Sequence, residues 1–317
     1  MTAGIIINPR SSSAGKRGRR LADEVSKRSG ILLESLENFS DLTSILERFA
    51  AKGVTTLFIS SGDGTVQAIQ TLLAENPIFE RLPTLALLPH GTTNMTATTL
   101  GCRPGNRTAI ADLAESQEAL ANPAIHKTRH TVRIVNPAGS GPMHGMFVGC
   151  GSIRGAVEFT QSAMNNNNIR GELAPLATLI ALMGRYLFSS AETAIVKAHP
   201  LHVEVDAETM ADGPLLLFMA STLEKLVLRC HPYWAPDTSE MKALTIAFPP
   251  PNVLRNILPL MYGLPNRNLP ASCQSRSIQA AHLSGTEDYV VDGEFFQAPA
   301  DEPLRLELGT EFTYLCP

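Results

Sequence analysis

The stretch Thr55–Thr65 (TTLFISSGDGT) joins a run of apolar and β-branched residues directly to a loop with two glycines. A short apolar run that ends at turn residues is typical of a buried strand, predicted here over residues 55–60. Apolar residues then recur at the spacing of one helix face over Val66–Asn76, which predicts a helix. The stretch therefore predicts a strand, a glycine loop and a helix in direct succession.

The same succession is found on both sides of this stretch. Gly4–Asn8 and Thr84–Leu88 have the composition of buried strands, and Gly15–Ser29 and Asp41–Lys52 have helical periodicity. Strands that alternate with helices favour a parallel sheet covered by helices on both faces. We therefore predict an α/β domain at the start of the chain.

The pattern changes near residue 127, where short strands between Pro/Gly-rich turns replace the alternation and favour an antiparallel sandwich. Helical insertions are expected at residues 171–188 and 252–263. The predicted organisation is an α/β domain over residues 1–127 and a β-rich domain over residues 128–317, with the option that its last strands return to the first domain. The expected strands include Thr131–Val135, Met143–Gly149, Leu201–Asp206, Leu215–Ser221, Glu224–Arg229 and Met241–Phe248.

Composition limits the classes of function. A chain of 317 residues with 44% apolar and 18% charged residues has the length of about two domains and can bury a core. A formal net charge of −4 disfavours a general nucleic-acid binder. Five scattered cysteines without a C-x-x-C pair favour a reducing compartment over a disulfide framework. No apolar run is long enough for a membrane span, so we expect a cytoplasmic protein.

Three loops that follow predicted strands contain the candidate ligand-binding residues: Asn8–Lys16, Ser61–Thr65 and Pro89–Asn94. The carboxyl ends of parallel strands line one crevice, so the loops should lie close together. Each loop precedes a helix, whose free N–H groups favour an anion, and Thr65 is expected to cap its helix. One such loop alone would be ordinary turn chemistry, but three together predict a phosphate site. Neither a P-loop nor a G-x-G-x-x-G pattern is present.

The second domain offers one compact acidic segment, Asp292-Gly293-Glu294, after the apolar residues Tyr289–Val291. Two carboxylates that are two positions apart on a strand face the same side. Next to a phosphate-binding crevice they would supply the metal ligand or base that phosphoryl transfer needs. The structural alternative is a β-turn with solvated acids.

Four motifs together resemble the signature of the diacylglycerol kinase and sphingosine kinase superfamily. They are N-P-R-S from Asn8, S-G-D-G-T from Ser61, P-x-G-T-x-N from Pro89 and D-G-E from Asp292. The chain length and the order of the two domains resemble the soluble bacterial lipid kinases. In that family ATP binds in the interdomain cleft, and a lipid hydroxyl attacks the γ-phosphate.

The resemblance implies specific roles for residues of this chain. The loop that carries Asp63 would bind ATP and its Mg²⁺, with Asp63 and Asp292 as metal ligands. We assign Glu294 to the lipid hydroxyl as general base, and Asp63 is the rival base. The expected contacts with the nucleotide are Asn8, Arg10, Ser12, Lys16, Gly62, Gly64, Thr65, Gly91, Thr92 and Asn94.

The predicted function is that of an ATP- and Mg²⁺-dependent kinase that phosphorylates the hydroxyl of a diacylglycerol-like lipid. Met95 stands where many bacterial diacylglycerol kinases carry an acid, and Ser61 replaces their first glycine; both features are closer to sphingosine-type kinases. A ceramide or sphingoid-base kinase is therefore the alternative, and an NAD kinase a more distant one. A non-enzymatic binding protein is disfavoured because Asp63 and the D-G-E acids are both present.

The expected partners are the lipid substrate and the inner membrane face, bound peripherally, without nucleic acid; a homodimer is left open. Basic residues such as Arg17, Arg19 and Arg20 would attract anionic lipid. The apolar residues within 173–188 would form either a core helix or the wall of an acyl-chain tunnel.

Overall fold

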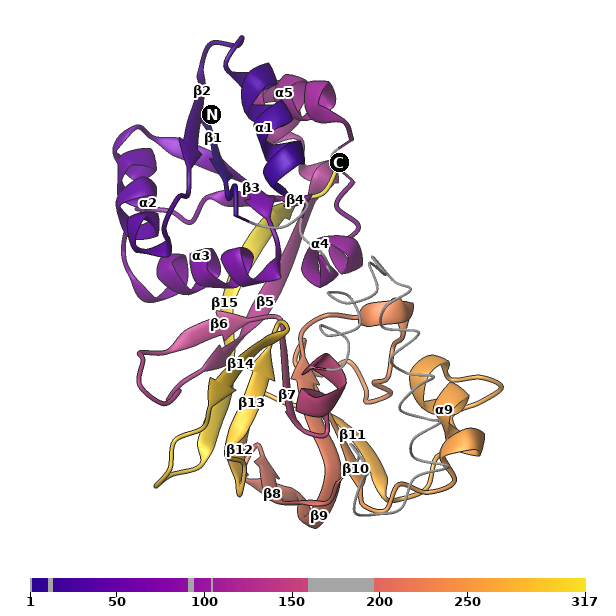
Figure 1. Cartoon of the computed structure of the whole chain (residues 1–317). Helices are drawn as coiled ribbons and strands as arrows, with labels where there is room; N and C mark the ends of the chain where they lie inside the picture. The colour runs from indigo at the N-terminus through magenta and orange to yellow at the C-terminus, as the bar shows by residue number, and fades with distance from the viewer. Residues whose placement is uncertain (1, 11–13, 91–93, 104, 159–196) are drawn as a thin grey trace. The chain divides into compact units, whose positions relative to one another are not determined.

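The computed structural model describes residues 2–10, 14–90, 94–103, 105–158 and 197–317 (Figure 1). The chain forms two compact units. The first unit comprises Met1–Arg129 and Thr310–Pro317, and the second comprises His130–Gly309. The helix expected at residues 171–188 lies outside the described residues.

The first unit is built on a parallel sheet, as predicted. β1 (Thr2–Ile7) pairs in parallel with β2 (Ile31–Ser35) and β3 (Val54–Ser61), and β3 pairs in parallel with β4 (Thr84–Pro89). The end of β15 (Leu304–Leu315) adds a parallel partner to β4 through Tyr314 and Leu85.

Helices cover both faces of this sheet (Figure 1). Apolar side chains of β1, β3 and β4 form one core with α1 (Ala14–Val25) and α5 (Arg107–Glu115). On the other face, the Cα of Gly4 approaches α2 (Leu42–Ala51) so closely that an added Cβ would lie 2.9 Å from the Phe49 ring. The remaining helical segments of this unit are η1 (Phe39–Asp41), α3 (Asp63–Glu75), α4 (Met95–Leu100), α6 (Gln117–Ala121) and η2 (Pro123–Ile125).

The second unit is antiparallel in every strand pair described within it. The strands are β5 (His126–Ile134), β6 (Met143–Gly145), β7 (Phe147–Gly151), β8 (His199–Val205), β9 (Glu208–Ser221), β10 (Lys242–Ala247), β11 (Cys273–Ser277), β12 (Ala280–Ser284), β13 (Asp288–Val291) and β14 (Glu294–Gln297). β9 pairs with β7, β8 and β10, and β10 also pairs with β11. β13 pairs with β14 and β7, β12 pairs with β8 and β15, and β5 pairs with β6.

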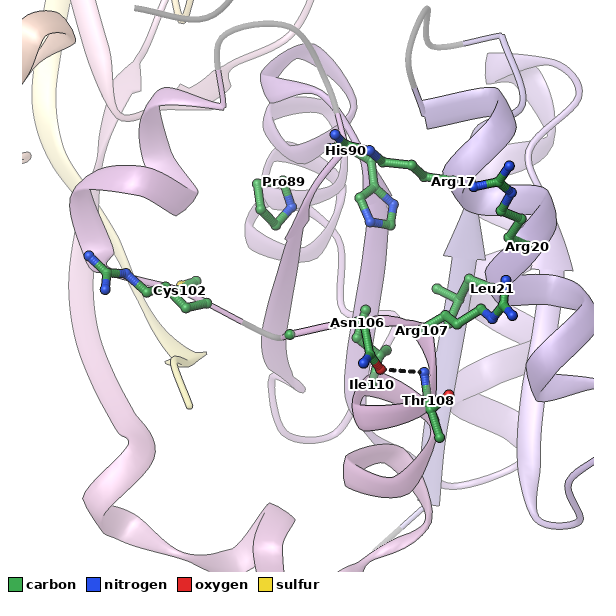
Figure 2. A pocket seen from close by; sticks show the side chains of 12 residues that line it. Arg17, Arg20, Leu21, Pro89, His90, Cys102, Asn106, Arg107, Thr108 and Ile110 are labelled. Carbon is green, nitrogen blue, oxygen red and sulfur yellow. Dashed lines mark hydrogen bonds between the residues drawn. The ribbon is translucent and has the colours of Figure 1, made fainter.

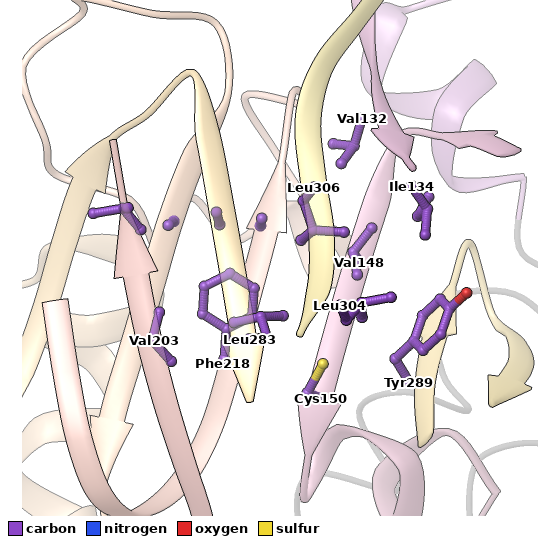
Figure 3. Packing of buried hydrophobic residues seen from close by; sticks show 14 of the residues in the cluster. Val132, Ile134, Val148, Cys150, Val203, Phe218, Leu283, Tyr289, Leu304 and Leu306 are labelled. Carbon is purple, nitrogen blue, oxygen red and sulfur yellow. The ribbon is translucent and has the colours of Figure 1, made fainter. Parts of the chain in front are cut away.

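The core of the second unit consists of inward-facing residues from several of these strands (Figure 3). In β8, Leu201, Val203 and Val205 alternate with less buried neighbours, which is the period-two pattern of a strand with one buried face. Phe218 of β9 and Leu283 of β12 complete the packing around Val203. The strand predicted over Leu201–Asp206 is therefore found as β8, and its buried face contributes to this core.

Two expectations in the second unit need correction. The strand predicted over Glu224–Arg229 is wrong: this segment contains the short helix η4 (Val227–Arg229), and Leu228 and Arg229 have φ values of 60° and 56°. Such left-handed backbone cannot continue a strand. The single strand predicted over Met143–Gly149 is divided into β6 and β7, because Met146 leaves the ladder and donates its N–H to Asp292 instead.

The helix expected at residues 252–263 is α9 (Val253–Tyr262), between Asn252 and Gly263 in left-handed backbone. Among the helices that the structure describes, none is both long enough and apolar enough to cross a membrane.

Candidate functional site in the glycine loops

The first two loops meet at one hydroxyl group. Thr65, buried in the first turn of α3, accepts hydrogen bonds from Asn8 Nδ2 at 3.0 Å and from Ser61 Oγ at 2.7 Å. The expectation that Thr65 caps α3 is wrong, because Gly62 occupies the cap position without a side-chain bond. The Thr65 hydroxyl instead holds the ends of β1 and β3 in a fixed relation.

Both polar atoms of the Asn8 side-chain amide form hydrogen bonds within the loops. While Nδ2 donates to Thr65, Oδ1 accepts from the backbone N–H of Arg10 at 3.0 Å, and the side chain is only 6% exposed. This local bond shapes the start of the first loop. Arg10 and Lys16 are exposed, whereas Ser12 lies outside the described residues.

Asp63 joins the second loop to the third. Its Oδ2 accepts from the Met95 N–H at 2.9 Å and its Oδ1 from the Thr96 N–H at 3.4 Å. These are free donors of the first turn of α4, so the carboxylate acts as a cap from 32 residues away. Burial raises the pKa of Asp63 above its ordinary value, and the N–H groups of Met95 and Thr96 oppose that increase.

The described end of the third loop shows what Met95 contributes to the site. Asn94 has a left-handed φ of 50° and turns the chain into α4, which places the backbone of Met95 against Asp63. The Met95 side chain is buried. This position therefore contributes a backbone donor to the site. Gly91 and Thr92 lie outside the described residues.

His90 belongs to the third loop and was not among the predicted site residues. Its Nδ1 lies 2.8 Å from Ser60 Oγ, and burial together with the charge of Arg17 lowers the pKa of His90 to about 4. At neutral pH the imidazole is therefore uncharged. No sequence pattern marked this residue, since its position in the P-x-G-T-x-N motif is variable.

The acids of the second unit differ from expectation. Asp292 and Gly293 have φ values of 48° and 93° and form the two-residue turn between β13 and β14. The carboxylate of Asp292 is 9% exposed and accepts from the N–H groups of Met146 and Phe147 at 2.9 to 3.1 Å. Glu294, the first residue of β14, is exposed. The two side chains do not share a strand face, because the turn intervenes between them.

Both carboxylates that were expected to bind a metal ion already accept backbone hydrogen bonds. Asp63 accepts from the N–H groups of Met95 and Thr96 through its two oxygens, and it has further hydrogen bonds with the Thr96 side chain and the Asn94 backbone. The Asp292 carboxylate likewise accepts through both oxygens, from Met146 and Phe147. Carboxylate oxygens are the ligands that Mg²⁺ prefers, and the role of these two residues as metal ligands stays a prediction.

Comparisons with known proteins agree with this fold. A sequence model of the diacylglycerol kinase catalytic domain matches residues 2–124. The crystal structure of a diacylglycerol kinase from Bacillus anthracis str. Sterne is 18% identical, with a TM-score of 0.60, and the alignment covers 100% of this chain and 97% of that one. A second structure from the same organism, also 18% identical over 100% and 97% of the two chains, gives a TM-score of 0.63.

An NAD kinase from Archaeoglobus fulgidus in complex with ATP is more distant, with 11% identity, a TM-score of 0.49 and coverage of 99% and 93%. Among curated proteins, no sequence match to this chain was found. Residues 2–124 of this chain therefore match the diacylglycerol kinase catalytic domain, and the chain as a whole has the fold of the Bacillus anthracis structures.

Proposed function

We propose that the protein is an ATP- and Mg²⁺-dependent lipid kinase that phosphorylates the hydroxyl of a diacylglycerol-like lipid. The observation that carries the proposal is the hydrogen-bond network that joins three glycine loops through Asn8, Thr65 and Asp63. A network of this kind holds the loop backbone in place before a ligand arrives. Such preorganisation is the main contribution that a protein makes to phosphoryl transfer.

The nucleotide contacts that we propose are the residues expected from the motifs. Two exposed cations, Arg10 and Lys16, suit the charge of a polyphosphate. The amino-terminal end of α3 at Gly62 adds backbone donors of the kind that bind anions. Asp63 would hold Mg²⁺, which when bound neutralises charge on the transferring phosphoryl group.

We assign the proton transfer to Glu294. The lipid oxygen would form a bond to the γ-phosphorus, the bond to the β,γ-bridging oxygen would break, and Glu294 would take the hydroxyl proton. Glu294 is exposed and has no hydrogen bond or ion pair among the described residues, so its carboxylate is available. Asp63 is the less suitable base, because both of its oxygens already accept backbone N–H groups. Asp292 would act as a positioning residue through Met146 and Phe147.

The two sequence departures have local contacts in the structure that do not involve a lipid. Ser61 was one of the features closer to sphingosine-type kinases, but its hydroxyl donates to Thr65 within the loop. Met95 likewise contributes its backbone to Asp63. The Ser61 contact lies within the loops, and the Met95 contact uses a backbone N–H that an acid at this position would also provide. We therefore retain the diacylglycerol-like acceptor as the primary proposal, with ceramide and sphingoid bases as the alternative.

The experiment is a radiolabelled-ATP assay against diacylglycerol, monoacylglycerol, ceramide and sphingoid bases, with identification of each product. We expect phosphate transfer to a glycerol-based lipid in the presence of Mg²⁺. Transfer to NAD alone would favour the NAD kinase alternative. Nucleotide binding without lipid-dependent ATP consumption would refute the enzymatic proposal.

We further propose that the protein acts at the inner membrane face as a peripheral protein. Leu254 and Leu258, one turn apart on α9, are 63% and 54% exposed, and exposed apolar side chains of this size suit an interfacial contact. The cations of α1 would add electrostatic attraction to anionic lipid. Vesicle sedimentation tests this: binding should be reversible and weakened by salt, and retention after carbonate washing would contradict it.

A further inference from the structure

The first unit contains a cavity outside the loop network. It has a volume of about 710 Å³ and is lined by residues of α1, the end of β4 and the start of α5 (Figure 2). Among the residues that the structure describes, the cavity shares Pro89 and His90 with the third loop and no other residue with the three loops.

Positive charge dominates the cavity. Arg17 and Arg20, one turn apart on α1, line it together with Arg103 and Arg107, and no aspartate or glutamate is among the lining residues. All four arginines are exposed to solvent, and like charges gathered in one cavity create a potential that attracts anions. The arrangement therefore favours a negatively charged ligand.

The arginines of the cavity have little compensation from the protein itself. Arg17, Arg20 and Arg103 form no ion pair among the described residues, and Arg107 Nε lies 4.0 Å from Glu24 Oε2, at the limit of an ion pair. Arg28, by contrast, lies 2.7 Å from both Asp112 and Glu115. Arg28, which does not line the cavity, is thus paired with two acids, whereas the arginines that line the cavity can still bind an anion.

The polar environment also suits an anion. The amino-terminal end of α5 lies at the cavity, where Asn106 Oδ1 accepts from the N–H groups of Thr108 and Ala109 at 3.0 Å each (Figure 2). The positive end of the helix dipole favours a negative charge there. His90, near Arg17, is uncharged at neutral pH because its pKa is about 4. It can therefore report on an anion, whose arrival would raise that pKa.

We propose that this cavity binds a phosphate-bearing ligand, either a free phosphate group or the phosphodiester headgroup of an anionic lipid. Guanidinium groups match phosphate oxygens geometrically through paired N–H donors, and four arginines line this cavity. The proposal rests on the arginines of the cavity, none of which is among the residues proposed to contact the nucleotide, so it does not depend on the proposed function.

The test compares two arginines on the same helix. Arg20 lines the cavity, and Arg19 is exposed on α1 but does not line it. Binding of inorganic phosphate to the full chain is measured by calorimetry, and binding to phosphatidylcholine vesicles with and without phosphatidylglycerol is measured by sedimentation at fixed salt. Arg17→Gln and Arg20→Gln should each weaken binding of inorganic phosphate roughly tenfold or more, while Arg19→Gln should change that binding by less than about twofold. Vesicle binding should fall more in Arg20→Gln than in Arg19→Gln, which removes only a surface charge.

The calorimetry with phosphate and the sedimentation with vesicles together distinguish a free phosphate group from a lipid headgroup as the ligand. Loss of inorganic phosphate binding in Arg20→Gln identifies a free phosphate group as sufficient, whereas loss confined to phosphatidylglycerol vesicles identifies the lipid headgroup. Equal effects of Arg19→Gln and Arg20→Gln in both arms, or no binding in either, would overturn the proposal.

A measurement on the unmodified protein covers the case in which a variant fails to fold. The ring signal of His90 is followed by NMR as pH is lowered, with and without inorganic phosphate or phosphatidylglycerol vesicles. A saturable increase in the His90 pKa with either probe supports the site. An unchanged pKa with both probes contradicts it.

Discussion

Replacing Asp63 by asparagine should separate the structural role of this residue from its chemical role. The side-chain oxygen of asparagine can still accept from the Met95 N–H, which lies 2.9 Å from the carboxylate in the wild type. The NH₂ group of asparagine then faces the Thr96 N–H and cannot accept from it. Losing that longer bond costs about 1 kcal/mol of folding free energy. The same change removes a buried charge whose desolvation raises the pKa of Asp63. The two effects oppose each other, so we expect stability to change by no more than about 1 kcal/mol.

Activity should change far more. The asparagine removes the negative charge proposed to organise Mg²⁺ at the nucleotide, which we expect to lower kcat roughly a thousandfold, about 4 kcal/mol in the activation free energy. The assay is lipid-dependent ATP turnover, alongside urea unfolding of the same preparations. Asp23→Asn, at an exposed acid on α1, is the matched control and should change neither quantity.

The dependence of the unfolding free energy on pH tests the sign of the desolvation effect. Because the folded-state pKa of Asp63 is raised above its ordinary value of 3.8, the contribution of this group to the unfolding free energy is fully present below that value. It is lost as pH increases through the raised pKa. The stability of the wild type relative to Asp63→Asn should therefore fall as pH increases across that range. A folded variant with near-normal turnover would refute the catalytic reasoning, and a stability loss of several kcal/mol would refute the balance of effects.

Other substitutions test the second unit and the membrane contact. Glu294→Gln should lower kcat strongly and leave ATP affinity almost unchanged, since the lost interaction belongs to the transition state; comparable losses in ATP affinity would argue against a base. Asp292→Asn keeps a residue type that tolerates left-handed backbone but loses acceptors for buried N–H groups, so urea unfolding should show a loss of about 2 kcal/mol. Unchanged stability would contradict a positioning role. Leu254→Asp should reduce vesicle binding without altering unfolding, and equal binding would exclude α9 from the membrane contact.

Much of the fold could be predicted from the sequence because its signals are local. The strand, loop and helix over residues 54–75 follow from an apolar run, two glycines and helical periodicity. Helix α9 lies between Asn252 and Gly263, both of which tolerate the left-handed backbone found there. In each case, neighbouring residues contain the information that decides the structure.

The features that escaped prediction depend on contacts between distant residues. Nothing near Asp63 indicates that its partners are the N–H groups of Met95 and Thr96. The arginines of the cavity come from two segments far apart in the sequence, brought together by the packing of α1 beside α5. The error at Glu224–Arg229 has a different cause, because left-handed backbone at Leu228 leaves no mark in composition.

The two hydrogen bonds of the Asn8 side-chain amide limit which residues can replace it. One oxygen must accept from Arg10 while one nitrogen donates to Thr65, in a space that is almost closed to solvent. Aspartate has the shape but lacks the donor, leucine has neither group, and glutamine carries the amide one methylene too far. In a saturation library selected for folding and turnover, asparagine should therefore predominate at position 8, while the exposed position of Asp23 accepts a wider range of residues.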